Sequence, residues 1–304
     1  MTRPPSAAPA PRGSTLLLVL AAIMLMSLSV MGLVNLLSRG LDESILAEKE
    51  FRARLLLDSA RAIAAHPAIQ RGDPLLRQQV SSATSYQINQ TTEGSRLAIN
   101  QLAANPQLRR LAQRLFEIWG LDSTQALTLT ESIADWTDPD DLPLPSGAER
   151  DLYLALEHPD YPYNRPFETL DDLPLVRGTE EMERLQPDWR NYFTLYGDGA
   201  IDVHTAPSPL LEALFNVTPS EVSRLIRTRR GPDGIPDNED DPLFKTLAEV
   251  RAVLDVPERN YRRGAALLTL AHPIRRTDCL VRAGSLERRL FLLTGPGLTI
   301  TREE

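Results

Sequence analysis

The stretch GSTLLLVLAAIMLMSLSVMGLVNLLS, residues 13–38, decides the architecture of this chain. It contains no charged side chain, and only a few serine, threonine and asparagine residues interrupt its apolar run. A helix of roughly 20 apolar residues spans the hydrocarbon core of a bilayer, whereas a secretory signal needs an apolar region of only about 7–15. The stretch is therefore predicted to be a transmembrane helix and is too long for an ordinary secretory signal.

The flanking charges predict how this helix is oriented. Arg3 and Arg12 precede it, and the first acidic residue after it is Asp42. The positive-inside rule then places the N-terminus in the cytoplasm and the rest of the chain outside it. Two interpretations remain open: an uncleaved anchor, or a short basic leader that is cut after Gly13 and leaves Ser14 as the first mature residue.

Composition limits the classes of protein that this chain can belong to. Its net charge is -8, which argues against nucleic acid as a partner, because phosphate binding draws on clustered lysine and arginine. Cys279 is the only cysteine, so one chain forms neither an internal disulfide nor a cysteine-based zinc cluster. The sequence shows no GxSxG, P-loop or HExxH motif, and we predict that the protein is not an enzyme.

Periodicity beyond the apolar stretch predicts helices and strands in turn. The expected elements are a helix at Leu41–Ala68, strands at Gln79–Gln90 and Arg96–Leu102 around a turn at 92–95, helices within 105–255, and strands within 267–273 and 278–293. Two helical hairpins are expected, one at Gly120–Ser123 and one at Leu214–Ile226. In the second, Thr218 is the expected N-cap and Glu221 its capping-box partner. Asn216 stands where DNA-binding hairpins usually carry glycine, so we interpret both hairpins as structural.

Motifs in the middle of the chain carry a family resemblance. IADWTDPDDLPLPSGAE occupies Ile133–Glu149, YNRPF and LPLVRG follow from 163 and 173, and IDVHTAP begins at Ile201. In this order they resemble the general secretion pathway protein K family, over a region from Gly13 to about Leu293. The chain departs from the family pattern at Asp202 and His204, where asparagines are usual, and at Thr137, where an aliphatic residue is usual.

The resemblance implies an α+β fold: a long N-terminal transmembrane helix and a pilin-like α/β domain with a large helical insertion of two SAM-like or helix-hairpin-helix-like parts. The implied domains are a leader (1–13), the transmembrane part of the helix (14–38), a periplasmic helix with the first strands (39–104), the helical insertion (105–255), and C-terminal strands with a tail that complete the sheet (256–304).

The resemblance also implies a function. Members of the family are minor pseudopilins of the type II protein secretion system, anchored in the inner membrane with the C-terminal domain in the periplasm. Prepilin peptidase would remove residues 1–13 after Gly13 and methylate Ser14. I- and J-type minor pseudopilins, together with other pseudopilins, are the implied partners, with which the protein would form the tip of a pseudopilus and start its assembly.

Leu18 bears on this position in the filament. It would be the fifth mature residue, where ordinary pilins carry a glutamate that is thought to meet the N-terminal amine of a neighbouring subunit. A carboxylate in lipid needs such a partner. Because Leu18 cannot supply that charge, this subunit needs no subunit above it, which suits a position at the tip.

Acidic side chains in the first motif are the candidate metal ligands. Calcium takes 6–8 oxygen ligands from carboxylates and carbonyls. Such groups gather at Asp138, Asp140, Asp141 and Glu149, and the resemblance raises the expectation of calcium there. A solvated acidic loop is the alternative, as it is for a second acidic stretch at 233–241. The alternative for the whole chain is an uncleaved single-pass anchor with a periplasmic binding module that depends on calcium.

Overall fold

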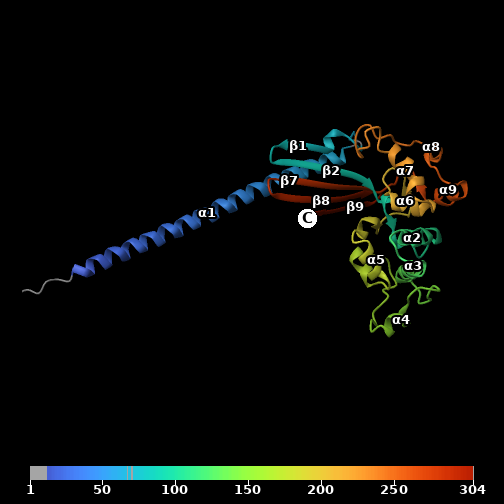
Figure 1. The fold of residues 1–304 in the computed structure, drawn as a ribbon, viewed down its shortest axis with the longest axis horizontal. Coiled ribbons are helices and arrows are strands. Elements are labelled where there is room, and N and C mark those ends of the chain that lie inside the picture. The colour runs from blue at the N-terminus through green and yellow to red at the C-terminus, as the bar shows by residue number, and fades with distance from the viewer. Residues whose placement is uncertain (1–11, 67, 70, 304) are drawn as a thin grey trace, which may run out of the picture.

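The structure is a computed structural model that describes residues 12–66, 68–69 and 71–303. Helix α1 (Arg12–Ala65) is a single helix of 54 residues that projects from the body of the molecule (Figure 1). It is long and apolar enough to cross a membrane. The helix predicted at Leu41–Ala68 is thus the second half of α1, and it ends at Ala65, shortly before Pro67. The implied leader lies largely outside the described residues.

A five-stranded antiparallel sheet lies beside the C-terminal half of α1 (Figure 1). Its order is β1 (Arg77–Ser81), β2 (Thr84–Thr92), β7 (Arg275–Ala283), β8 (Leu286–Gly295) and β9 (Leu298–Glu303). Strands β2 and β7 pair along their whole length, from Thr84 opposite Ala283 to Thr92 opposite Arg275. The two ends of the long intervening segment are therefore held next to each other.

Small side chains let α1 pack closely on this sheet. Ala53, Leu57, Ala60 and Ala64 are buried on one side of the helix, against alternate inward-facing residues of β2, β7 and β8. Cys279 is one of these inward-facing residues, and burial raises the pKa of its thiol to about 12. The thiol therefore stays protonated and behaves as an apolar core group.

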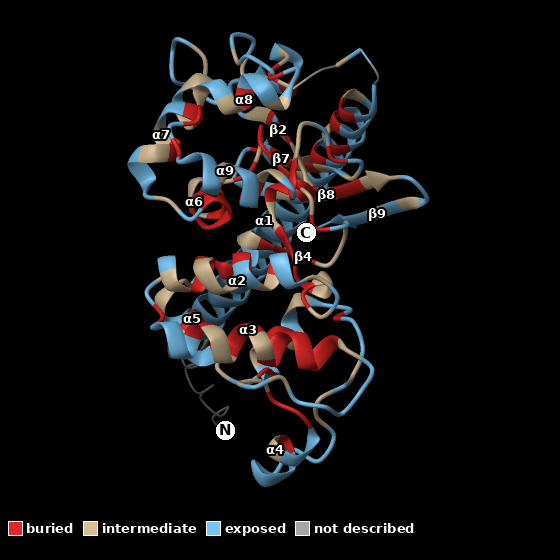
Figure 2. Cartoon of the chain, turned by 90° about the vertical axis from the view of Figure 1, so that its right-hand side faces the viewer, coloured by how far each residue is buried: buried red, intermediate tan, exposed pale blue. Residues whose placement is uncertain are grey.

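Helices fill the segment between β2 and β7 and form a separate, larger core. Figure 2 shows two groups, α2–α5 and α6–α9, stacked one above the other. Their bounds are α2 (Pro106–Ile118), α3 (Ser123–Thr137), α4 (Arg150–Ala155), α5 (Thr179–Leu185), α6 (Ser208–Phe215), α7 (Pro219–Thr228), α8 (Leu247–Val253) and α9 (Glu258–Ala265). Short parallel pairs join β3 (Leu97–Ala98) to β4 (Phe193–Thr194) and β5 (Ile201–Asp202) to β6 (Leu268–Thr269).

Local capping explains both predicted hairpins. Asp122 caps α3 in a capping box with Gln125, directly after the α2–α3 turn. In the α6–α7 turn, Asn216 adopts a left-handed conformation, and the Glu221 carboxylate accepts the Thr218 N–H at 2.8 Å. These contacts satisfy backbone groups that the start of a helix would otherwise leave unpaired.

Three predicted boundaries were wrong. The strand expected at Arg96–Leu102 is only Leu97–Ala98, because a 3₁₀ turn at Ile99–Gln101 follows it. Helix α9 extends the helical part past the expected boundary at Asp255. The tail after Leu293 carries strand β9, which forms an edge of the sheet.

Candidate functional site

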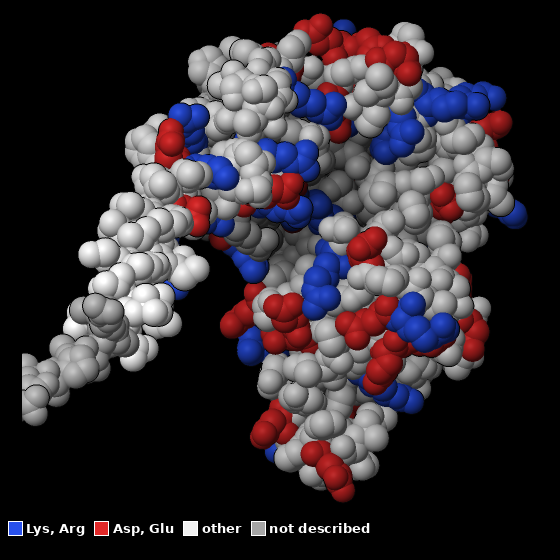
Figure 3. Space-filling view, turned by 60° about the vertical axis from the view of Figure 1, so that its left-hand side comes forward, with Lys and Arg blue, Asp and Glu red and all other residues white. Residues whose placement is uncertain are grey.

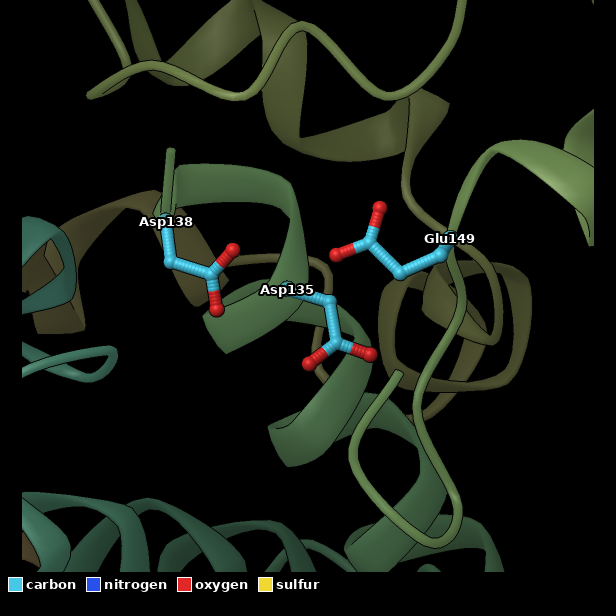
Figure 4. Close-up of side chains that lie close together, drawn as sticks. All are labelled: Asp135, Asp138 and Glu149. Carbon is cyan, nitrogen blue, oxygen red and sulfur yellow. The ribbon is translucent and has the colours of Figure 1, made fainter. Parts of the chain in front are cut away.

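Three carboxylates meet where α3 ends and α4 begins. Asp135 lies in the last turn of α3, Asp138 follows the helix as its C-cap, and Glu149 is the N-cap of α4. One oxygen from each lies within 4.8 Å of the other two (Figure 4). The proline-rich loop between the helices turns back and brings Glu149 to the end of α3.

Asp135 and Glu149 are buried, Asp138 is half-buried, and three of the six carboxylate oxygens lack a hydrogen-bond partner among the described residues. The exposed fraction is 0% for Asp135 and 4% for Glu149. Asp135 accepts the backbone N–H of Leu144, at 3.2 Å from each oxygen. Within the described part of the chain, neither Glu149 oxygen nor Oδ1 of Asp138 has a hydrogen-bond partner. An unpaired buried carboxylate is costly, so these surroundings favour the protonated acid or a bound cation over a bare carboxylate.

Burial shifts the acidity of all three groups. It raises the pKa of Glu149 to about 8, and the nearby carboxylates of Asp135, Asp138 and Asp141 add to the effect. It likewise raises the pKa of Asp135 to about 6, against the lowering effect of its backbone hydrogen bonds, and raises the pKa of Asp138. Like charges brought together out of water favour the protonated acids.

Gly147 makes the close approach of the loop to α3 feasible. A Cβ atom at this position would lie 1.8 Å from Oδ2 of Asp135, so no larger residue fits without moving the carboxylate. The Arg177 guanidinium donates to the Gly147 carbonyl at 3.2 Å, and the Arg177 N–H donates to the Tyr153 hydroxyl at 3.1 Å. Buried Trp136 packs its ring against Tyr153 and Tyr161. The loop is thus fixed from both sides.

The structure brings together only two of the four ligands predicted from the sequence. Asp138 and Glu149 do come together, but Oδ1 of Asp140 accepts the Leu142 N–H at 2.8 Å and Oδ1 of Asp141 accepts the Asn164 amide at 2.9 Å. Asp140 and Asp141 thus stabilise the loop itself. Asp135 takes their place, and its spacing of three residues from Asp138 was the overlooked signal, because such residues share one face of a helix. The acidic stretch at 233–241 contributes no such group among the described residues.

Comparisons with known proteins connect this region to a family. Residues 95–188 match the family model of Type II secretion system (T2SS), protein K. The chain is 33% identical over 147 residues to type II secretion system protein K of Klebsiella pneumoniae and 32% identical over 131 residues to that of Pseudomonas aeruginosa. These matches cover 43% and 42% of this chain and only 44% and 38% of the relatives, less than half of their length.

A solved structure extends the likeness to the whole fold. The chain superposes on a chain of the crystal structure of the GspK-GspI-GspJ complex from the enterotoxigenic Escherichia coli type 2 secretion system with a TM-score of 0.61. The match covers 86% of this chain and 98% of that chain at 15% identity. It confirms the predicted α+β fold with a helical insertion, and the sequence matches confirm the resemblance to protein K.

Asp202 and His204 stand where asparagines are usual in the K pattern, and both lie outside the matched residues 95–188. Asp202 belongs to β5, and His204 follows this strand. The Asp202 carboxylate accepts the Thr92 hydroxyl at 2.8 Å and the His204 N–H at 2.9 Å. The His204 imidazole faces the Leu270 carbonyl and the Phe244 N–H. Each side chain therefore uses both of its polar side-chain atoms, on two different partners. The residues that depart from the K pattern thus form hydrogen bonds at the junction of sheet and insertion.

The residues predicted to direct processing and filament position lie on α1. Gly13 and Ser14 belong to the first turn of this helix, and their side chains fall outside the description. Leu18 is exposed, with 71% of its surface accessible. Figure 3 shows the protruding part of α1 with almost no charged surface, in contrast to the mixed charges of the body.

The raised pKa of Glu149 predicts how stability depends on pH. Between pH 4.5, its ordinary pKa, and about 8, the unfolded chain ionises this carboxyl whereas the folded chain keeps it protonated. The free energy of unfolding then falls as the pH rises. Measured in EGTA near pH 8, Glu149→Gln should therefore unfold at a higher temperature than the unsubstituted protein. Near pH 4.5 the two proteins should unfold at similar temperatures. Thermal unfolding by tryptophan fluorescence measures this, and a difference independent of pH would contradict it.

Proposed function

We propose that this protein is a minor pseudopilin that forms the tip of the type II secretion pseudopilus and initiates its assembly with I- and J-type minor pseudopilins. The match of residues 95–188 to the protein K family model carries the proposal. The likeness in fold to a chain of a K–I–J complex and the apolar helix α1 support it. In this role the protein is an assembly factor for the export of folded proteins across the outer membrane, and not an enzyme.

The shape of the molecule favours the tip over the body of a filament. Here the helical insertion lies at the end of the molecule opposite the free end of α1, beside and beyond the sheet (Figure 1). A further subunit added above would meet this bulk, so growth proceeds from below.

Processing at the N-terminus belongs to the same proposal. Prepilin peptidase cuts after Gly13 and methylates Ser14, and α1 then anchors the chain in the inner membrane with the sheet and insertion in the periplasm. The decisive test is the intact mass of the protein from membranes of cells with and without prepilin peptidase. Peptidase-dependent loss of residues 1–13 with one added methyl group is expected. An unchanged mass would favour the uncleaved anchor instead.

Leu18 offers a test of the tip position. In Leu18→Glu the new carboxylate has no amine from a subunit above, and an unpaired acid in a membrane helix costs about 2.5–3.5 kcal/mol. We expect at least a tenfold lower yield of the complex with I- and J-type pseudopilins, roughly the effect of 1.4 kcal/mol or more. The readout is co-purification from membranes, with Leu18→Met as the matched control. Undiminished assembly of Leu18→Glu would place the subunit within the filament body.

We further propose that the carboxylates of Asp135, Asp138 and Glu149 hold a calcium ion. Their unpartnered buried oxygens are hard donors of the kind that calcium prefers. Bound calcium would neutralise the like charges and stabilise the loop between α3 and α4.

Calcium should raise the unfolding temperature of the full-length protein in detergent, because the ion binds the folded state alone. Glu149→Gln should lose most of this rise, whereas Asp140→Asn, whose carboxylate stabilises the loop outside the site, should keep it. Differential scanning fluorimetry in CaCl₂ and in EGTA measures both. An equal response of Glu149→Gln and the unsubstituted protein would overturn the assignment.

A further inference from the structure

His204 lies at the centre of the junction between the sheet and the helical insertion. Only 7% of the surface of His204 is exposed, and both ring nitrogens face backbone groups from distant parts of the chain. The Phe244 N–H donates to Nε2 at 2.9 Å, and Nδ1 lies 3.1 Å from the Leu270 carbonyl oxygen. The ring also stacks on the Phe244 side chain, with 5.7 Å between the centroids.

These contacts allow only the neutral imidazole. Because Nε2 accepts the Phe244 N–H, it must carry a lone pair, and the ring proton must sit on Nδ1, where it can donate to Leu270. An imidazolium has a donor at both nitrogens and no acceptor. Protonation would therefore set two N–H groups against each other at Nε2 and leave the buried amide of Phe244 without an acceptor.

The surrounding charges determine which contact protonation breaks. Oδ1 of Asp202 lies 3.4 Å from Nδ1, so a charged ring is held on that side. Arg71 donates to the His204 carbonyl at 3.0 Å, and Arg229 donates to the carbonyls on either side of it, those of Val203 and Ala206. These two guanidinium groups fix the backbone of His204. The ring therefore cannot move away as a unit, and the contact with Phe244 is the one that is lost.

The segment on the other side of that contact has few other anchors. Phe244 is buried, but the residues before it form the exposed acidic stretch 233–241. Asp237 of this stretch forms an ion pair with Arg71, which lies between α1 and β1. The bond from Phe244 to His204 thus ties the stretch to the insertion, whereas the Asp237–Arg71 pair ties it to the start of the sheet.

We propose that His204 is an acid-sensitive latch: its protonation at Nε2 frees the Phe244 amide and loosens residues 231–245 from the junction. Histidine is the side chain that ordinarily changes its charge between pH 5 and 8. An asparagine amide does not change its charge in that range, so it could not act as such a switch. The latch therefore depends on the histidine at this position.

Hydrogen exchange of the full-length protein in detergent tests the latch. Mass spectrometry would follow peptides that contain Phe244 at about pH 7.5 and about pH 5.5, on either side of the ordinary histidine titration. After correction for intrinsic exchange rates, protection of this segment should fall about tenfold or more at the lower pH, the effect of one lost buried hydrogen bond. Peptides from β7 and β8 should keep their protection.

Two substitutions separate the latch from general acid effects. His204→Asn should give equal protection of the segment at both pH values, because the amide stays neutral. His272→Asn, at a second buried histidine whose Nδ1 accepts the Ile274 N–H at 3.2 Å, should keep the pH dependence of the unsubstituted protein. Constant protection in the unsubstituted protein, or a fall that persists in His204→Asn, would overturn the proposal.

Discussion

The pairing of β2 with β7 is the constraint on which the rest of the molecule depends. It joins Thr92 to Arg275 and so closes a loop that contains the whole helical insertion. Closing a flexible loop of that length costs about 5 kcal/mol of chain entropy, and the cost grows only slowly with length. The insertion can be large because it has its own hydrophobic core, which stabilises it independently of the sheet.

A compact set of polar contacts completes this closure. The buried Glu93 carboxylate, directly after β2, receives the hydroxyl of Thr194 and lies 3.5 Å from the guanidinium of Arg276 on β7. Asp202 adds a further contact by accepting a hydrogen bond from the Thr92 hydroxyl. Burial alone would raise the pKa of Asp202, but hydrogen bonds from His204 and Thr92 hold that pKa below its usual value. The sheet and the insertion thus meet through buried charges that are paired, which fixes their relative orientation more strictly than apolar contact would.

Sequence reasoning was most successful where a single local signal suffices. The uncharged apolar run predicted the start of α1, and the Thr218–Glu221 pair predicted the start of α7, because both depend on residues close in sequence. Strand Leu97–Ala98 depends on a distant partner, Phe193–Thr194, and no local pattern reveals such pairing. The candidate metal site lies between these cases. Asp138 and Glu149 were among its predicted ligands, but Asp135 was not, since the burial of a carboxylate beside Trp136 cannot be seen in the sequence.

The unbroken course of α1 has a mechanical consequence for the assembled state. Its 54 residues correspond to about 80 Å of rigid rod, and the side chains that it buries against the sheet begin only at Ala53. Adding or removing one residue between the bilayer and Ala53 would rotate the whole body by about 100° around the rod and shift it by only about 1.5 Å along it. The number of residues in that interval therefore sets the rotational orientation of the globular part around the axis of α1. Substitutions in the interval should be tolerated far better than insertions or deletions.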